Sequence, residues 1–190
     1  MPTSLKCLRL SIFIVLSAWS LSALAATQND WVPSGFDDTP KKWEEAAIQL
    51  PPPPAAANLM EFYVGPTATQ TFFVDEKSMS ISGDGVVHYT LVSKSKSGAI
   101  NVSYEGIRCA TVEKKQFAYG RQDGTWDLAH DPAWRPITEL VANRQHAALV
   151  KDYFCDTNTI AGTLTDIIKR IKYKRPLAPA RDYSSGSDNR

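Results

Sequence analysis

Residues 86–113 read VVHYTLVSKSKSGAINVSYEGIRCATVE, the only long stretch of the chain in which strand alternation recurs. Its first part places Val87, Tyr89 and Leu91 on one face, as the two-residue period of a pleated strand requires. Residues 94–98 are polar and end in glycine, which predicts a chain reversal before the alternation resumes at Ile100. The stretch therefore predicts the central hairpin of an antiparallel sheet.

Gly106 interrupts the alternation in the second half of this hairpin. The apolar residues change parity from Tyr104 to Ile107 and Cys109, as an extra residue in a β-bulge would require. We therefore expect a bulge at Gly106, with Cys109 pointing into the core beside Ile107.

Shorter strand-like segments flank the hairpin on both sides. Residues 59–64 and 71–75 are rich in aromatic residues, and residues 79–81 can add a short strand. After the hairpin, residues 115–120 alternate again, and Asp123-Gly124 predicts a tight turn that leads to Trp126. These segments predict about six antiparallel strands.

Beyond residue 136 the pattern becomes helical. Apolar residues recur at helical spacing up to Cys155, and Thr159 is a candidate N-cap for a final helix. The apolar stripe of that helix would consist of Ile160, Leu164, Ile167, Ile168 and Ile171. The predicted fold class is α+β, an antiparallel sheet packed against C-terminal helices.

The first 25 residues have the pattern of a secretory signal peptide. Lys6 and Arg9 precede an apolar run over residues 10–24, and residues 23–25 read ALA, a small-x-small cleavage site. A membrane anchor, the alternative, needs about 20 apolar residues, whereas four serines break this run. We therefore expect cleavage after Ala25 and export of the mature chain.

Cleavage changes both the charge and the cysteine content. The full chain has 21 Lys and Arg, 20 Asp and Glu, and a net charge of +1. Removing Lys6 and Arg9 leaves a nearly neutral protein, without the basic excess typical of nucleic-acid binding. Cys7 is lost too, and the remaining pair, Cys109 and Cys155, predicts a disulfide. A catalytic thiolate at either cysteine remains the alternative.

The mature chain divides into three parts. Residues 26–58 predict an irregular arm, a short helix over residues 41–50 with Thr39 as N-cap and Pro40 at its first position, and a stiff connector at the four prolines 51–54. Those prolines could alternatively be a ligand for an aromatic groove. Residues 59–175 predict a single α+β domain, and residues 176–190 a disordered tail.

Candidate binding residues cluster at residues 126–134, which read WDLAHDPAW. Trp126 and Trp134, with Tyr119 and the polar His130, could form a platform for a sugar ring, or they could cap the core. The acidic residues and His130 of this loop match no standard metal site, so we expect no metal and no cofactor. His130 and Asp131 could instead serve a hydrolase.

A catalytic triad of a serine with His146 and Asp152 can also be written down. The chain has no Gly-x-Ser-x-Gly motif to support it. The last helix and its tail carry Lys169, Arg170, Lys172, Lys174 and Arg175, which either contact anionic lipid or complement the helix dipole.

Three segments resemble the cryptic neisserial protein family of small bacterial envelope proteins: YEGIRCATVEKKQFAYG, DGTWDLAHDPAWRPI and NRQHAALVKDYFC. The likeness covers residues 31–172. It implies an exported, periplasmic protein without a known activity, and it supplies no catalytic residues. Some relatives carry a lipid anchor, but this sequence has no cysteine directly after the signal peptide.

The sequence and the resemblance together predict a non-enzymatic periplasmic protein that binds or supports another component of the bacterial cell envelope. Its expected partner is an envelope protein or a glycan, with no nucleic acid and at most peripheral membrane contact. An envelope hydrolase that uses the loop of His130 and Asp131 is the alternative.

Overall fold

The computed structural model describes residues 42–138 and 143–177. In these residues a single eight-stranded antiparallel sheet has the order β1-β2-β4-β5-β6-β7, with β3 paired to β4 and β8 to β6. The strands are β1 (Leu59–Phe62), β2 (Gln70–Asp75), β3 (Ser80–Ile81), β4 (Val86–Ser95), β5 (Ile100–Arg108), β6 (Glu113–Gly120), β7 (Trp126–Leu128) and β8 (Arg135–Pro136). Short 3₁₀ turns, η1 (Ala56–Asn58) and η2 (Glu76–Ser78), precede β1 and β3.

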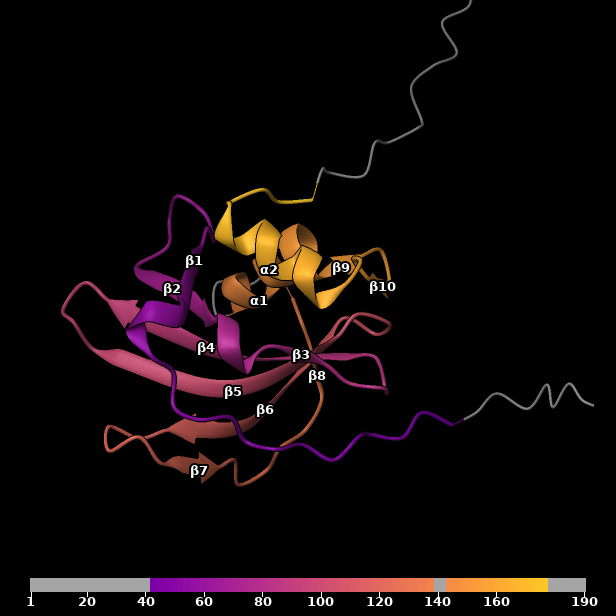
Figure 1. Ribbon diagram of the computed structural model, residues 1–190, viewed down its shortest axis with the longest axis horizontal. Helices are drawn as coiled ribbons and strands as arrows, with labels where there is room; N and C mark the ends of the chain where they lie inside the picture. The colour runs from indigo at the N-terminus through magenta and orange to yellow at the C-terminus, as the bar shows by residue number, and fades with distance from the viewer. Residues whose placement is uncertain (1–41, 139–142, 178–190) are drawn as a thin grey trace, which may run out of the picture. The chain divides into compact units, whose positions relative to one another are not determined.

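The helical part follows the sheet in the chain and lies on one side of it (Figure 1). It comprises α1 (Arg144–Ala148), the π-helical segment η4 (Leu149–Phe154), the small hairpin β9 (Cys155–Asp156) and β10 (Thr159–Ile160), and α2 (Leu164–Lys172). The predicted α+β class and the predicted helix ending at Cys155 are confirmed.

The helix-covered face of the sheet carries the larger core. The predicted alternation of β4 is confirmed, because Val87, Tyr89 and Leu91 are buried in this core. They share it with Leu149, Val150, Tyr153 and Phe154 of η4 and with Ile167 and Ile171 of α2. The first eight residues of β4 are all buried, so the opposite face of this strand is covered as well.

The opposite face is covered by the N-terminal part of the described chain. A second cluster, Tyr104, Phe117 and Ala118, packs there against Ile48, Leu50, Trp126 and Trp134. The segment that contributes Ile48 and Leu50 runs past β6 on the side away from the helices (Figure 1). The sheet is therefore a buried middle layer over much of its area.

The predicted helix over residues 41–50 is wrong, because residues 42–50 contain no helix. The Trp43 indole N–H donates to the Asp84 carbonyl and the Ala46 N–H to the Asp84 carboxylate, both at 2.8 Å. A helix this short is only marginally stable alone, whereas the extended chain gains these bonds and buries Ile48 and Leu50 on the sheet. Thr39, Pro40 and Lys41 lie outside the described residues.

The bulge predicted at Gly106 is also misplaced. The pairing of β4 with β5 is regular, and the irregularity lies between β5 and β6, where Phe117 is the extra residue between the pairs Tyr104–Ala118 and Glu105–Gln116. Gly106 is needed for close packing, because an added Cβ would lie 2.9 Å from Val86 Cγ1. The apolar residues change parity because both faces of the sheet are buried.

The last helix begins later than predicted. Thr159 lies in β10, and its hydroxyl donates to the Asp156 carbonyl at 2.9 Å. The N-cap of α2 is Thr163, which forms a capping box with Asp166, and Gly162 with a φ of 81° separates the two segments. The predicted stripe is confirmed from Leu164 onward, with Ile167 and Ile171 buried, whereas Ile160 lies in β10.

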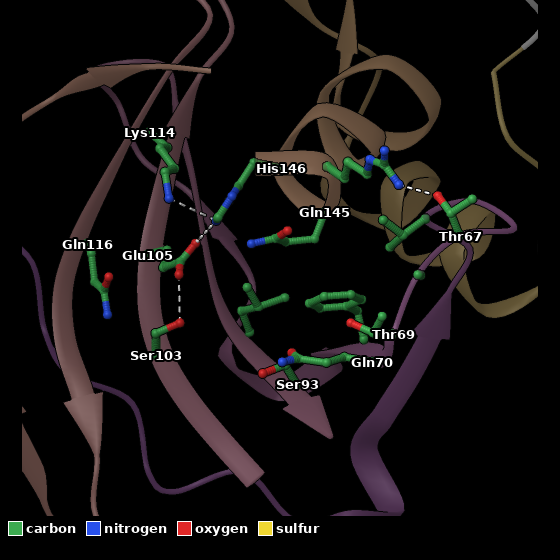
Figure 2. Close-up of a pocket in the computed structure, with 15 residues that line it drawn as sticks. Thr67, Thr69, Gln70, Ser93, Ser103, Glu105, Lys114, Gln116, Gln145 and His146 are labelled. Carbon is green, nitrogen blue, oxygen red and sulfur yellow. Dashed lines mark hydrogen bonds and ion pairs between the residues drawn. The ribbon is translucent and has the colours of Figure 1, made fainter. Parts of the chain in front are cut away.

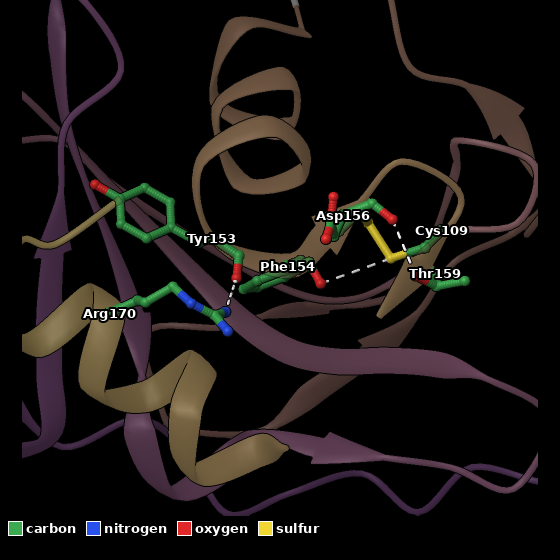
Figure 3. The surroundings of a disulfide bond; sticks show 7 residues. Cys109, Tyr153, Phe154, Asp156, Thr159 and Arg170 are labelled. Carbon is green, nitrogen blue, oxygen red and sulfur yellow. Dashed lines mark hydrogen bonds between the residues drawn. A yellow bond between two sulfur atoms is a disulfide. The ribbon is translucent and has the colours of Figure 1, made fainter. Parts of the chain in front are cut away.

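The predicted disulfide is confirmed between Cys109 and Cys155, whose Cα atoms are 5.6 Å apart. It joins the end of β5 to the end of η4 (Figure 3). Nearby, the Arg170 guanidinium donates to the Tyr153 carbonyl at 2.6 Å and to the Ala161 carbonyl. These contacts tie α2 to the helical layer.

The predicted signal peptide and most of the predicted tail lie outside the described residues. Within the described part of the chain, no helix is long and apolar enough to cross a membrane.

Removal of the disulfide should weaken the fold. Cys109 and Cys155 are 46 residues apart, and closing a loop of that length stabilises a protein by about 4 kcal/mol on the chain-entropy estimate. We expect the double variant Cys109→Ala/Cys155→Ala to have a free energy of unfolding in urea lower by up to about 4 kcal/mol. Reductant should destabilise the natural protein and leave the double variant unchanged. Equal stability of the two proteins would contradict this prediction.

Candidate functional site

A polar cavity of about 390 Å³ lies on the helix-covered face of the sheet, between strands β2, β4, β5 and β6 and the start of α1. Figure 2 shows its polar side chains converging from these elements and from the loop before β2. Hydroxyl and amide groups line much of it, from Thr67, Thr69, Gln70, Ser93, Ser103 and Gln116. Phe72, Leu91 and Val64 supply its apolar lining. A volume of this size suits a small ligand.

Glu105 is the carboxylate of this cavity, and it is only 3% exposed. It lies on β5 opposite Tyr89 of β4. The Tyr89 hydroxyl donates to Glu105 Oε2 at 3.0 Å, and the Ser103 hydroxyl donates to Oε1 at 2.6 Å. His146 Nε2, on α1, is 2.7 Å from Oε2. Both carboxylate oxygens are therefore hydrogen-bonded.

These contacts determine the charge state of Glu105. Burial by itself would raise the pKa of this carboxyl group, because it disfavours the ionised form. The charge and hydrogen bond of His146, the hydrogen bond of Ser103 and the charge of Lys114 outweigh burial and lower the pKa to about 2. Tyr89 responds in the opposite direction, since burial and the neighbouring Glu105 raise the pKa of its phenol well above the ordinary value. Glu105 is thus ionised and Tyr89 neutral at physiological pH.

His146 is 2% exposed and is held by this carboxylate. Because ionised Glu105 can only accept hydrogen bonds, Nε2 of His146 carries the hydrogen that lies between them. The other ring nitrogen, Nδ1, is buried and has no hydrogen-bond partner among the described residues. The imidazole therefore bonds Glu105 through Nε2, and no hydrogen bond joins it to a serine hydroxyl among the described residues.

Two cations line the same cavity. The Lys114 ammonium lies 3.5 Å from His146 Nε2 (Figure 2). Arg144, two residues before His146 on α1, donates to the Thr67 hydroxyl across the cavity wall. Since Glu105 is the only carboxylate among the lining residues, the lining has an excess of positive charge.

A comparison of the sequence with protein-family models identifies the family of this chain. The model described as the CNP1-like family matches residues 38–172. This chain belongs to the CNP1-like family. No curated protein and no solved structure matches it. The match includes Glu105, Lys114 and His146 of the cavity and both bridged cysteines.

The aromatic residues predicted to bind a ligand do not form one platform in this CNP1-like chain. Trp126 pairs with Gly120 across β6 and β7, and its indole N–H donates to the Pro51 carbonyl at 2.7 Å. Tyr119, the residue before Gly120, therefore lies on the opposite face of the strand, where it is 51% exposed. The structure separates it from both tryptophans.

Trp134 instead packs on the face of the sheet opposite the helices, against the second cluster. Its ring packs edge-on against Trp43 at 5.8 Å and lies 5.5 Å from the Arg108 guanidinium, which also stacks on Trp43. Its partly buried position in the second cluster agrees with a core-capping role. A ligand-binding role for Tyr119, Trp126, His130 or Trp134 stays a prediction.

His130 and Asp131 are exposed in the loop between β7 and β8, and neither lines the cavity. The hydrolase that would use them stays a prediction. In the alternative triad, His146 contacts Glu105 rather than Asp152, whose carbonyl accepts from the Leu177 N–H at 2.8 Å. No group of three or more His, Cys, Asp or Glu side chains in the described residues is placed to hold a metal ion.

The sequence contained a signal for the cavity that our reading missed. Glu105 has the same strand parity as Ile107, so it lies on a core face, where a carboxylate requires polar partners. The pairing of Tyr89 with Glu105 follows from the register of the predicted hairpin. Neither observation identifies His146, which joins the site from a helix 41 residues away in the chain.

Glu105 should make the stability of the protein depend on acidic pH. Its pKa is lowered from 4.5 to about 2 in the fold, so its contribution is complete above about pH 5 and is lost as the pH falls toward 2. The contribution is on the order of 3 kcal/mol. We expect the free energy of unfolding of the natural protein to fall by about that much more than that of Glu105→Gln over this interval.

The matched control for this experiment is Glu61→Gln, which changes an exposed glutamate of β1. It should retain the pH profile of the natural protein in urea titrations at about pH 7, 5, 4, 3 and 2. Parallel profiles for Glu105→Gln and the natural protein would contradict an ionised, stabilising Glu105.

Proposed function

We propose that this protein is exported to the periplasm and acts there without catalysis, binding a small polar component of the cell envelope in the cavity between the sheet and α1. The observation that carries the proposal is a polar cavity of about 390 Å³ whose buried carboxylate, Glu105, has both oxygens hydrogen-bonded within the protein. Ligand sites typically combine a few fixed polar groups with apolar walls. This cavity has that composition.

Export is supported by the predicted signal peptide and by the disulfide. Disulfides persist in oxidising compartments such as the periplasm and are rare in the bacterial cytoplasm. The Cys109–Cys155 bond is therefore compatible with the compartment that the first 25 residues predict.

The hydrogen bonds of the cavity favour binding over turnover. A nucleophilic serine requires a direct contact with its general base, but the Ser103 hydroxyl donates to Glu105 and not to His146. The Nε2 of His146 is occupied by the same carboxylate, and Nδ1 is buried. The Ser103–Glu105–His146 order leaves the imidazole without access to a reacting hydroxyl. The three residues form a fixed wall.

A blocked cavity should lose its ligand. Thr69 is exposed at the cavity, so Thr69→Trp fills the space with little cost to the core. Thr71→Trp, also exposed and nearby on β2 but not lining the cavity, is the matched control. We expect the natural protein and Thr71→Trp to retain the same small molecule from a low-molecular-weight envelope extract, and Thr69→Trp to retain none.

Retention is measured by ultrafiltration, denaturation of the protein and mass spectrometry of the released molecules. Identical sets of molecules released from all three proteins, or none released from any, would contradict binding in this cavity.

Export is tested by the intact mass of the protein recovered from the periplasmic fraction. We expect a mass that corresponds to residues 26–190 with no thiol alkylated until reductant is added. Recovery of the full-length mass from the cytoplasm, or alkylation of both thiols without reductant, would contradict export through this signal peptide.

A further inference from the structure

The cavity has a chemical preference that follows from its two cations. Resting on the proposed function, we infer that its ligand is an acidic sugar, a hexose-sized molecule with one carboxylate, and that Lys114 is the residue that contacts this carboxylate.

Lys114 has hydrogen-bond donors that the protein does not use. Its ammonium makes a single polar contact among the described residues, at 3.5 Å from His146 Nε2. That nitrogen already donates its hydrogen to Glu105, so it offers Lys114 no lone pair. The charge of Lys114 is attracted to Glu105, but both oxygens of that carboxylate are hydrogen-bonded by other groups. The three N–H bonds of the ammonium are therefore available to an acceptor in the cavity.

The neighbouring residue of β6 shows the contrast. Lys115 lies on the other face of the sheet, where its ammonium contacts both carboxylate oxygens of Glu45 at 2.7 and 2.8 Å. The side chain of Lys115 is thus paired with a carboxylate within the fold, whereas Lys114 faces a cavity whose one carboxylate accepts its hydrogen bonds from other groups. A partly buried cation with unused donors favours an anionic ligand.

Arg144 adds to the positive potential of the cavity. Its guanidinium donates to the Thr67 hydroxyl, and the two residues come from different elements of the lining, α1 and the loop before β2. A guanidinium stays charged at every physiological pH. Among the described residues no carboxylate forms an ion pair with Arg144, so its charge remains to attract an anion in the cavity.

The remaining lining suits a sugar ring better than a simple inorganic anion. Gln70, Gln116 and Ser93 offer amide and hydroxyl groups that can both donate to and accept from ligand hydroxyls. Phe72 and Leu91 present apolar surface to the same space, which can cover the C–H groups of a ring. A cavity of about 390 Å³ exceeds what a phosphate or sulfate ion would fill.

The test compares matched ligand pairs on the disulfide-bonded mature protein by NMR titration. Each hexuronate, such as D-glucuronate or D-galacturonate, is paired with the neutral hexose from which it differs only by the carboxylate, and glucose 6-phosphate provides a phosphate in place of that group. We expect at least one hexuronate to bind about tenfold or more tightly than its hexose and than the sugar phosphate, with an affinity that decreases as salt increases.

Three variants locate the contact. Lys114→Gln should lose about tenfold or more in affinity for the hexuronate, and with it most of the preference over the hexose and most of the salt dependence. Arg144→Gln should lose less affinity and only part of the salt dependence, and Lys115→Gln should bind as the natural protein does. Lys114→Gln must retain the near-ultraviolet circular dichroism of the natural protein, and Lys114→Met, which keeps the length of the side chain without its charge, provides a second variant if it does not.

Equal affinity for hexose and hexuronate, preference for the sugar phosphate, or an unchanged preference in a folded Lys114 variant would each overturn the inference. So would the absence of binding by every hexuronate. In each of these cases the proposed function is judged separately, by whether Thr69→Trp loses a molecule that Thr71→Trp retains.

Discussion

The burial of one ionised carboxylate, Glu105, constrains the whole arrangement around the cavity. An unpaired charge in a protein interior is strongly destabilising, so it must be paired and hydrogen-bonded where it lies. Tyr89 supplies one partner from the neighbouring strand and Ser103 another from the same strand. His146 supplies the third from α1. The carboxylate thereby connects two neighbouring strands and the short helix α1 at one buried point.

Two further sets of contacts hold the segments that cover the two faces of the sheet. The disulfide fixes the end of η4 to the end of β5 on the helix side. On the other side, Trp43 and Ala46 are hydrogen-bonded to Asp84 in the turn between β3 and β4, and Glu45 is paired with Lys115 at 2.7 Å. The second covering segment is held by polar contacts at its N-terminal end and by Ile48 and Leu50 beyond them. A sheet buried on both faces needs a covering on each.

The sequence predicts those parts of the fold that depend on neighbours in the chain. The hairpin and the stripe of α2 come from local periodicity, and the pairing of Cys109 with Cys155 comes from counting the cysteines that remain after the predicted cleavage. The conformation of residues 42–50 depends on Asp84, about 40 residues away. The prediction used only the local helix signals and therefore missed this contact. The same distance separates Glu105 from His146. Strand parity could have identified Glu105 as buried, but no local pattern identifies its partner.

The hydrogen-bond partners of ionised Glu105 also determine which groups of the cavity are available to a ligand. If Lys114 were the direct partner of the carboxylate, the two charges would cancel and the cavity would present only amides and hydroxyls. Because Tyr89, Ser103 and His146 bond the carboxylate oxygens instead, Lys114 interacts with Glu105 through its charge, and its ammonium lies 3.5 Å from His146 Nε2. Its position is stabilised, yet its donors are unused. A cation positioned in this way meets a ligand without first breaking an ion pair, and preorganisation of that kind reduces the cost of binding.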